Sequence, residues 1–313
     1  MITVIQQGLF TTVQDEGRWG YQAYGLPVAG MMDRYSGRIV NMLAGNKEQA
    51  AVLEMTGLGA VFKFDEEQFV AVGGADMGVR VNGTAVPNWS AFFVPKNGEV
   101  RFAEVVSGYR SYMAVRGGID VPVVLGSRST CVKAGVGGYE GRPLRQGDVL
   151  AIGQQGQGQH REQILPDDFV PTYDNKITVR VILGPQHTMF SEEVMADFFA
   201  KPYTVTKQAD RVGYRLTGTR ILPIGKADII SDAMYQGAIQ IASHGMPFIM
   251  LADHQTTGGF AKLGYVIQSD LPKIAQVKTG DSIRFCCVNE AEALVALREE
   301  QQVYRVVSDI VAR

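Results

Sequence analysis

Cysteine is scarce in this chain of 313 residues, which has only Cys131, Cys286 and Cys287. An odd number of cysteines, two of them adjacent in a strand-like run, excludes a disulfide framework. The sequence also lacks the Cys-x-x-Cys redox motif and any spacing typical of a zinc site. We therefore expect three buried thiols in a protein of the reducing cytoplasm.

Long apolar runs and a strong charge of one sign are missing as well. No run approaches the roughly 20 apolar residues that span a bilayer, and the formal net charge is −2. No basic run indicates a nucleic-acid surface. The N-terminal residues lack a basic region followed by a long apolar core, so we expect no secretory signal. These absences favour a cytoplasmic protein that contacts neither nucleic acid nor membrane.

Several short motifs of catalysis are absent too. The chain has no Gly-x-x-x-x-Gly-Lys-Ser/Thr phosphate loop, no Gly-x-Ser-x-Gly elbow and no His-Glu-x-x-His pair. His244, Asp253 and His254 fit no strong metal template, so we expect no metal. A lysine between two methionines, typical of a biotin carrier, is also missing. Any biotin would have to arrive on another protein.

Glycine and short strand-like runs are what the sequence has in quantity. The 36 glycines separate runs rich in valine, phenylalanine and isoleucine, which predicts a mainly β protein of barrel or sandwich type. Asn82-Gly83 predicts a hairpin turn, because such turns need positive φ, and Asn97-Gly98 predicts a second one. The expected strands are 2–5, 61–64, 69–72, 78–81, 91–94, 100–102, 112–115, 177–183, 203–206, 237–242, 247–251, 265–268 and 282–288.

A few helices interrupt the strands. Asp33 is placed to cap a helix with an apolar stripe over 35–43, a second helix is expected over 191–199, and a third over 289–313. We expect the stripe of the last helix to dock on the chain's own barrel. A polar, glycine-rich stretch over 153–173 predicts a linker. The predicted domains are therefore two β-barrels, residues 1–155 and residues 175–313, the second including the C-terminal helix.

The first candidate site lies near the N-terminus. The stretch from Thr11 to Asp33 places Gln14, Asp15 and Arg18 among glycines, which predicts an ordered, irregular loop. A structural alternative carries equal weight: Asp15 and Arg18 could form an ion pair that pins the loop. Asp33 has an adequate role as a helix cap.

Three further polar clusters lie at glycine-rich strand ends, and each could simply be a turn whose side chains bond its own backbone. Taken together they favour a shared polar pocket. The clusters are Gly126-Ser127-Arg128-Ser129-Thr130, Asp210-Arg211-Val212-Gly213-Tyr214-Arg215, and Ala252-Asp253-His254-Gln255-Thr256-Thr257-Gly258-Gly259.

These motifs, in this order, resemble the KipA family, also called the C subunit of 5-oxoprolinase or allophanate hydrolase subunit 2, and often described as a biotin-dependent carboxyltransferase. The resemblance covers the chain to about Phe285. It is carried by the N-terminal loop, the three clusters and the runs Leu53-Glu54-Met55-Thr56, Ala114-Val115-Arg116-Gly117-Gly118 and Gly237-Ala238-Ile239-Gln240.

The resemblance implies two cyclophilin-like β-barrel domains and a heteromeric enzyme. Its partners would be a KipI-like B subunit and an A subunit of the LamB/YcsF type, and together they would cleave 5-oxo-L-proline to L-glutamate with ATP. Two alternatives stay open. Fused relatives form the carboxyltransferase region of urea carboxylase, which uses biotin. A regulatory member of the family antagonises KipI without catalysis.

Opening the lactam requires groups that place water and groups that hold the substrate carboxylate. ATP would activate the lactam oxygen, and the missing phosphate loop indicates that the nucleotide is bound partly or wholly by a partner. We expect Arg128 or Arg211 to bind the substrate carboxylate. The hypothesis assigns catalysis to Asp15, Asp210, Asp253 and Gln255, and substrate binding to Arg18, Arg128, Arg211, Thr256 and Thr257.

Overall fold

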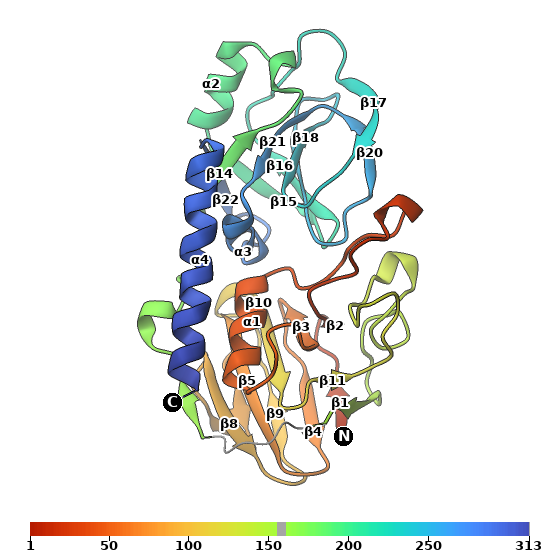
Figure 1. Cartoon of the computed structure of the whole chain (residues 1–313), viewed down its shortest axis with the longest axis vertical. Coiled ribbons are helices and arrows are strands. Elements are labelled where there is room, and N and C mark those ends of the chain that lie inside the picture. Colours follow the sequence, from red (N-terminus) through yellow and green to blue (C-terminus); the bar gives the residue numbers. More distant parts are fainter. Residues whose placement is uncertain (155–160, 313) are drawn as a thin grey trace. The chain divides into compact units, whose positions relative to one another are not determined.

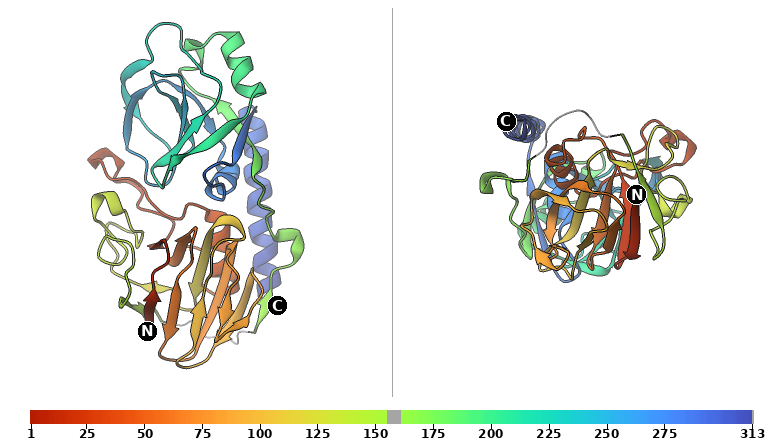
Figure 2. Two further views of the ribbon diagram at one scale, coloured as in Figure 1. Left: turned by 180° about the vertical axis from the view of Figure 1, so that it is seen from behind. Right: turned by 90° about the horizontal axis from the view of Figure 1, so that it is seen from below.

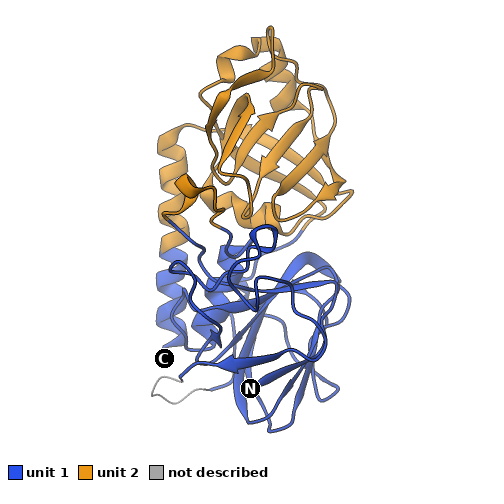
Figure 3. Ribbon diagram, turned by 90° about the vertical axis from the view of Figure 1, so that its right-hand side faces the viewer, with its two compact units in different colours: residues 1–19, 29–173, 302–313 blue, residues 20–28, 174–301 orange. Residues whose placement is uncertain are grey.

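The computed structural model describes residues 1–154 and 161–312. The chain forms two compact units (Figures 1 and 3): residues 1–19, 29–173 and 302–313 make the first, and residues 20–28 and 174–301 make the second. Of the predicted linker over 153–173, residues 155–160 lie outside the described part. Residues 161–173 group with the first unit and contain the short strand β13 (Gln163–Ile164).

Two antiparallel sheets build the first unit (Figures 1 and 2), and the helix α1 (Arg34–Leu43) packs on one of them. One sheet has the order β11-β12-β1-β4-β9-β6-β7, and the other has the order β13-β8-β5-β10-β3-β2. The strands are β1 (Ile2–Gln6), β2 (Phe10–Gln14), β3 (Val52–Thr56), β4 (Val61–Phe64), β5 (Gln68–Asp76), β6 (Arg80–Val81), β7 (Thr84–Ala85), β8 (Ser90–Val94), β9 (Glu99–Arg101), β10 (Ser107–Val115), β11 (Ile119–Asp120) and β12 (Val149–Ile152).

Strand β5 shows how the sequence builds this unit. Side chains alternate between the two faces of a strand. Val70 and Val72 therefore enter the core between the two sheets, whereas Phe69 and Ala71 face α1 on the other side. Because both faces are covered, the strand is apolar at every position in this stretch.

The second unit contains a closed barrel of seven strands in the order β14-β21-β18-β19-β16-β15-β22. A separate two-stranded sheet pairs β17 (Asp228–Ala233) with β20 (Thr257–Phe260). Helix α2 (Glu192–Ala200) contacts β22, and the Phe198 and Phe285 rings stack with 4.6 Å between their centroids. The remaining elements are β14 (Lys176–Leu183), β15 (Tyr203–Ala209), β16 (Gly213–Thr217), β18 (Ala238–Ile241), β19 (Pro247–Met250), β21 (Lys262–Val266), α3 (Leu271–Ala275), β22 (Ser282–Cys287) and α4 (Glu290–Val311).

The predicted fold class, mainly β with a few helices, is confirmed. The predicted caps are also confirmed: the Asp33 carboxylate accepts from the Ser36 N–H at 2.9 Å, and Asn289 and Glu292 form a reciprocal capping box. Asn82 and Gly83 join β6 to β7 with positive φ at both residues, as a two-residue hairpin turn requires.

The apolar stripe of α4 packs on the chain itself, as expected. Tyr304 and Val307 are buried in the cluster that includes Ile39 and Val40 of α1. Residues 302–313 therefore group with the first unit, whereas the sequence analysis placed the whole helix in the second domain.

Other expectations are corrected. Residues 11–14, predicted as the start of an irregular loop, belong to strand β2, which pairs with β3, because Thr and Val suit a pleated strand. The Asn97-Gly98 turn joins two strands of different sheets rather than a hairpin. Cys131 is buried as expected, but Cys286 and Cys287 are exposed at the end of β22.

Candidate functional site

The Asp15 carboxylate is the hub of a polar cluster in the first unit. Its Oδ1 accepts from the Gly17 N–H at 2.8 Å and from the hydroxyls of Ser127 and Ser129 at 2.6 and 2.5 Å. Its Oδ2 accepts from the Arg128 N–H at 2.5 Å. Four donors thus converge on one half-buried carboxylate. This arrangement ties the loop after β2 to the loop over 127–129.

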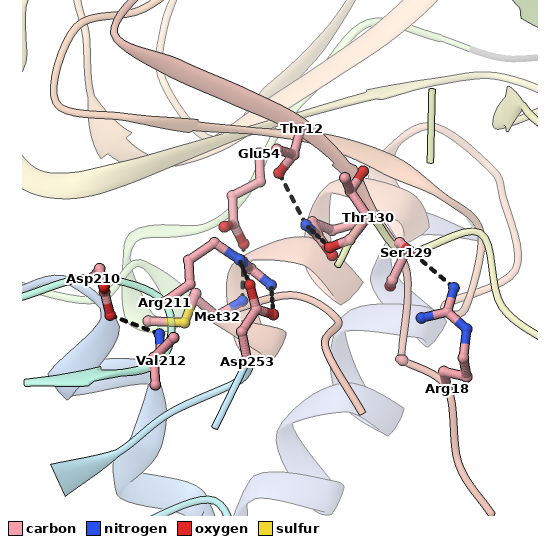
Figure 4. A network of polar contacts seen from close by, with 12 residues as sticks. Thr12, Arg18, Met32, Glu54, Ser129, Thr130, Asp210, Arg211, Val212 and Asp253 are labelled. Carbon is pink, nitrogen blue, oxygen red and sulfur yellow. Dashed lines mark hydrogen bonds and ion pairs between the residues drawn. The ribbon is translucent and has the colours of Figure 1, made fainter. Parts of the chain in front are cut away.

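Neither nearby arginine points its guanidinium at Asp15. Arg18 is 1% exposed and donates to the Ser129 carbonyl oxygen at 2.9 Å (Figure 4). It also donates to the Val124 carbonyl oxygen at 3.0 Å. Arg128 donates to the Val121 carbonyl and forms a partly exposed ion pair with the Asp120 carboxylate at 3.2 Å. The alternative of an ion pair between Asp15 and Arg18 is therefore wrong, although the loop is pinned.

A second buried network in the first unit was missed by the site prediction. Tyr112 donates its hydroxyl to the Glu54 carboxylate and accepts from the Asp33 N–H, both at 2.8 Å, and Glu54 also accepts from the Met32 N–H. Burial raises the pKa of Tyr112 well above its ordinary value, and the carboxylates of Glu54 and Asp33 add to the effect. The hydroxyl therefore stays protonated. The signal in the sequence was a glutamate inside the apolar run 52–55.

In the second unit, Arg211 and Asp253 form a buried bidentate ion pair (Figure 4). The Nε and an Nη of Arg211 donate to the two carboxylate oxygens at 3.0 and 2.9 Å, and both side chains are 6% exposed. The Asp253 N–H also donates to the Arg211 carbonyl at 2.8 Å. The pair joins the turn before β16 to the segment after β19, with the fork geometry that arginine and carboxylate favour.

The other predicted residues of this unit make local contacts or are exposed. The Asp210 carboxylate accepts from the N–H groups of Val212 and Gly213, as an Asx turn does. The Thr256 carbonyl accepts from Met234, and Thr257 is exposed at the start of β20. His254, next to Asp253, is buried, and this burial lowers its pKa.

A groove of about 990 Å³ runs along the outside of the barrel of the second unit. Of the predicted residues, Asp210 and Gln255 line it, whereas Arg211, Asp253, Thr256 and Thr257 do not. Its lining residues come from β15, β16, β18, β19 and β20 and from the adjoining turns. They include Lys207, Asp210, Arg215, Thr217, Gln240, His244, Met246, Phe248, Gln255, Gly258 and Phe260.

Strand register explains how the groove acquires its polar wall. Arg215 pairs with Phe248 across β16 and β19, and Phe248 pairs with Gln240 across β19 and β18. The flanking residues Tyr214 and Ile249 are fully buried within the unit. Alternation along the strands therefore turns Arg215, Phe248 and Gln240 to the opposite, outer face. None of these three residues was among the predicted site residues, although polar residues between apolar ones in 213–216 and 238–241 indicate such a row.

The predicted site residues thus fall into two polar groups, one in each unit. Asp15, Arg18 and Arg128 share the first, while Arg211, Asp253, Asp210 and Gln255 belong to the second. Across residues 1–154 and 161–312, no three His, Cys, Asp or Glu side chains are placed to hold a metal ion. In the same part of the chain no helix is both long and apolar enough to cross a bilayer.

Comparison with known proteins gives one family and two kinds of relative. A family described as "Carboxyltransferase domain, subdomain A and B" matches residues 24–287. The C subunit of the 5-oxoprolinase of Escherichia coli is 35% identical over 97% of this chain and 96% of its own length. The corresponding 5-oxoprolinase chain of Haemophilus influenzae is 30% identical over 97% and 96%.

Among solved structures, the urea amidolyase of K. lactis matches 98% of this chain with a TM-score of 0.93 and 29% identity. The chain spans only 20% of the length of that polypeptide. The family and the mainly β fold are thereby established from both sequence and structure.

Proposed function

The chain belongs to the family of the carboxyltransferase domain, subdomain A and B, and we propose that it is the C subunit of an ATP-dependent 5-oxoprolinase complex. The observation that carries the proposal is the 35% identity to the E. coli protein over nearly the whole length of both chains. The match to urea amidolyase covers only a fifth of that larger protein. The proposal therefore follows the 5-oxoprolinase comparison, which covers nearly all of both chains.

The proposed reaction opens the lactam of 5-oxo-L-proline to give L-glutamate. A lactam amide is stabilised by resonance, and ATP supplies the activation of its oxygen. We assign the nucleotide to a partner, because this chain has no Gly-x-x-x-x-Gly-Lys-Ser/Thr loop. The partners would be a KipI-like B subunit and an A subunit of the LamB/YcsF type.

The contacts of the expected site residues support different roles for them. Asp210 and Gln255 line the groove of the second unit and could reach a bound substrate or water. The Arg211–Asp253 pair is buried and bidentate, which supports a role in holding the turn before β16 rather than in binding the carboxylate. Asp15, with four donors on its oxygens, is placed to hold its loop in the same way.

Carboxyl transfer is the second candidate function, favoured by the family description and by the urea amidolyase relative. The carboxyl group would come from carboxybiotin carried on another protein, with urea or an analogue as the acceptor. This chemistry would leave the nucleotide to the biotin-carboxylating partner.

Co-expression with the two partner proteins tests the proposal. The purified complex should release glutamate from 5-oxo-L-proline only when ATP is present, and omission of this chain should abolish the release. Consumption of carboxybiotin with urea, without any lactam hydrolysis, would replace the proposal by the second candidate.

A further inference from the structure

We propose that the groove of the second unit binds a five-membered cyclic amide that carries a carboxylate, with Arg215 on the carboxylate and Phe248 beneath the ring. The identification of this ligand as 5-oxo-L-proline rests on the proposed function. The proposal for the groove itself rests on the charges, faces and contacts of its lining residues.

The described lining of the groove includes two cationic side chains, Arg215 and Lys207, and a single carboxylate. Arg215 is exposed, and its guanidinium lies 5.4 Å from the centroid of the Phe248 ring. Among residues 1–154 and 161–312 this guanidinium makes no ion pair or hydrogen bond, and neither does the ammonium group of Lys207. Asp210 is the one carboxylate among the described lining residues, and two backbone N–H groups already bind it. The groove therefore favours an anion.

The wall of the groove is formed by a row of three different side chains. Arg215, Phe248 and Gln240 stand in one row across three neighbouring strands, so a cation, an aromatic face and an amide follow one another in that order. A guanidinium held over a ring is oriented to present its fork of N–H donors to a carboxylate. A flat five-membered ring can lie against Phe248 while its carboxylate reaches Arg215.

Two side-chain amides, those of Gln240 and Gln255, line the groove. The Gln240 side chain is 2% exposed and its Nε2 donates to the Phe260 carbonyl at 3.2 Å, which fixes its orientation. The side-chain amide of Gln255 lines the same groove and forms no hydrogen bond with any other described residue. An amide offers both a donor and an acceptor, which is what the N–H and C=O of a lactam require.

Gly258 is the fourth element, because it brings β20 against this row. A Cβ at residue 258 would lie 2.6 Å from the Nε2 of Gln240 and 2.4 Å from the Cε of Met234. A side chain at this position would therefore displace Gln240 from the wall. The bare backbone is what lets β20 close one side of the groove.

The test is a calorimetric titration of the full-length protein with 5-oxo-L-proline, pyrrolidin-2-one, which lacks the carboxylate, and L-proline, which lacks the lactam carbonyl. Loss of a hydrogen bond to a charged group predicts an increase of about 10- to 100-fold in Kd for Arg215→Ala. Arg220→Ala removes an exposed arginine of the same unit that does not line the groove, and should bind like the wild type. Circular dichroism establishes that each variant is folded.

The preference for a ligand with a carboxylate tests the pairing with Arg215 more directly than the affinity alone. The wild type should bind 5-oxo-L-proline more tightly than pyrrolidin-2-one, whereas Arg215→Ala should bind the two with nearly equal affinity. Arg215→Lys should recover part of the preference. Equal binding by the wild type, Arg215→Ala and Arg220→Ala would overturn the inference.

The enzyme assay separates this inference from the proposed function. If the complex hydrolyses 5-oxo-L-proline and Arg215→Ala leaves its KM unchanged, the groove is not the substrate site although the function stands. If the protein binds the lactam through Arg215 but the complex does not hydrolyse it, the groove assignment stands and the proposed function fails.

Discussion

Replacing Asp15 by alanine tests whether its carboxylate has a structural or a catalytic role. The change removes the acceptor of four donors, among them the hydroxyls of Ser127 and Ser129, which are 1% and 0% exposed. A buried polar group left without a partner costs about 1–3 kcal/mol. Water can reach the half-buried position of Asp15 and offset part of this cost. We therefore expect Asp15→Ala to lower the free energy of unfolding of the first unit by about 2–4 kcal/mol.

Asp120→Ala is the matched control, because Asp120 and Asp15 both contact Arg128. The Asp120 and Arg128 side chains are 53% and 38% exposed, so their ion pair should contribute less than about 1 kcal/mol. Both tryptophans, Trp19 and Trp89, belong to the first unit. Urea unfolding followed by tryptophan fluorescence therefore reports on this unit directly.

The stability of Asp15→Ala and the activity of the complex that contains it together decide whether Asp15 has a structural or a catalytic role. A variant Asp15→Ala that unfolds at the same urea concentration as Asp120→Ala would refute the structural reasoning. If such a stable variant had also lost the activity of the complex, Asp15 would be catalytic. A large loss of stability that accounts for the loss of activity is the result that we expect.

Three further predictions concern buried groups. Arg211→Met should cost about 3–5 kcal/mol, because it strands the buried Asp253 carboxylate, and the double variant with Asp253→Leu should cost less than the sum of the two single losses; additive losses in a double-mutant cycle would contradict the pairing. Tyr112→Phe should cost about 1–3 kcal/mol, because the Asp33 N–H and Glu54 lose a partner, and a loss below about 0.5 kcal/mol would be too small for that network. Burial lowers the pKa of His254, so below about pH 6.5 the unfolded chain binds a proton that the folded chain does not. The free energy of unfolding should therefore fall with pH below this value, by up to about 1.4 kcal/mol per unit, and less steeply in His254→Gln; equal slopes in chemical unfolding series at several pH values would exclude this contribution.

The predictable parts of the fold are those set by local chemistry. Asp33 and Asn289 cap helices because a short polar side chain can reach the free N–H groups of the first turn, whatever the tertiary context. The hairpin at Asn82-Gly83 follows in the same way from positive φ. Strand β2 was missed because the glycines that follow it dominated the pattern, and its pairing with β3 depends on residues about 40 positions away.

The candidate site was predictable in its residue types but less so in its contacts. The sequence indicated polar clusters around Asp15 and Asp253, and in the structure both carboxylates accept hydrogen bonds from other polar side chains. It could not indicate that Arg18 donates to backbone carbonyl oxygens, because every residue has such an oxygen and the residue type does not show which one accepts. The row of Arg215, Phe248 and Gln240 depends on the register of three strands and emerges only from the fold.

We propose that this chain is an obligatory component of a lactam-opening enzyme. Its most direct test is glutamate release from 5-oxo-L-proline by the reconstituted complex, measured with and without this chain and with and without ATP. We predict release only when all the component proteins and ATP are present. Equal release by the partners alone, or no release by the full complex, would contradict the account.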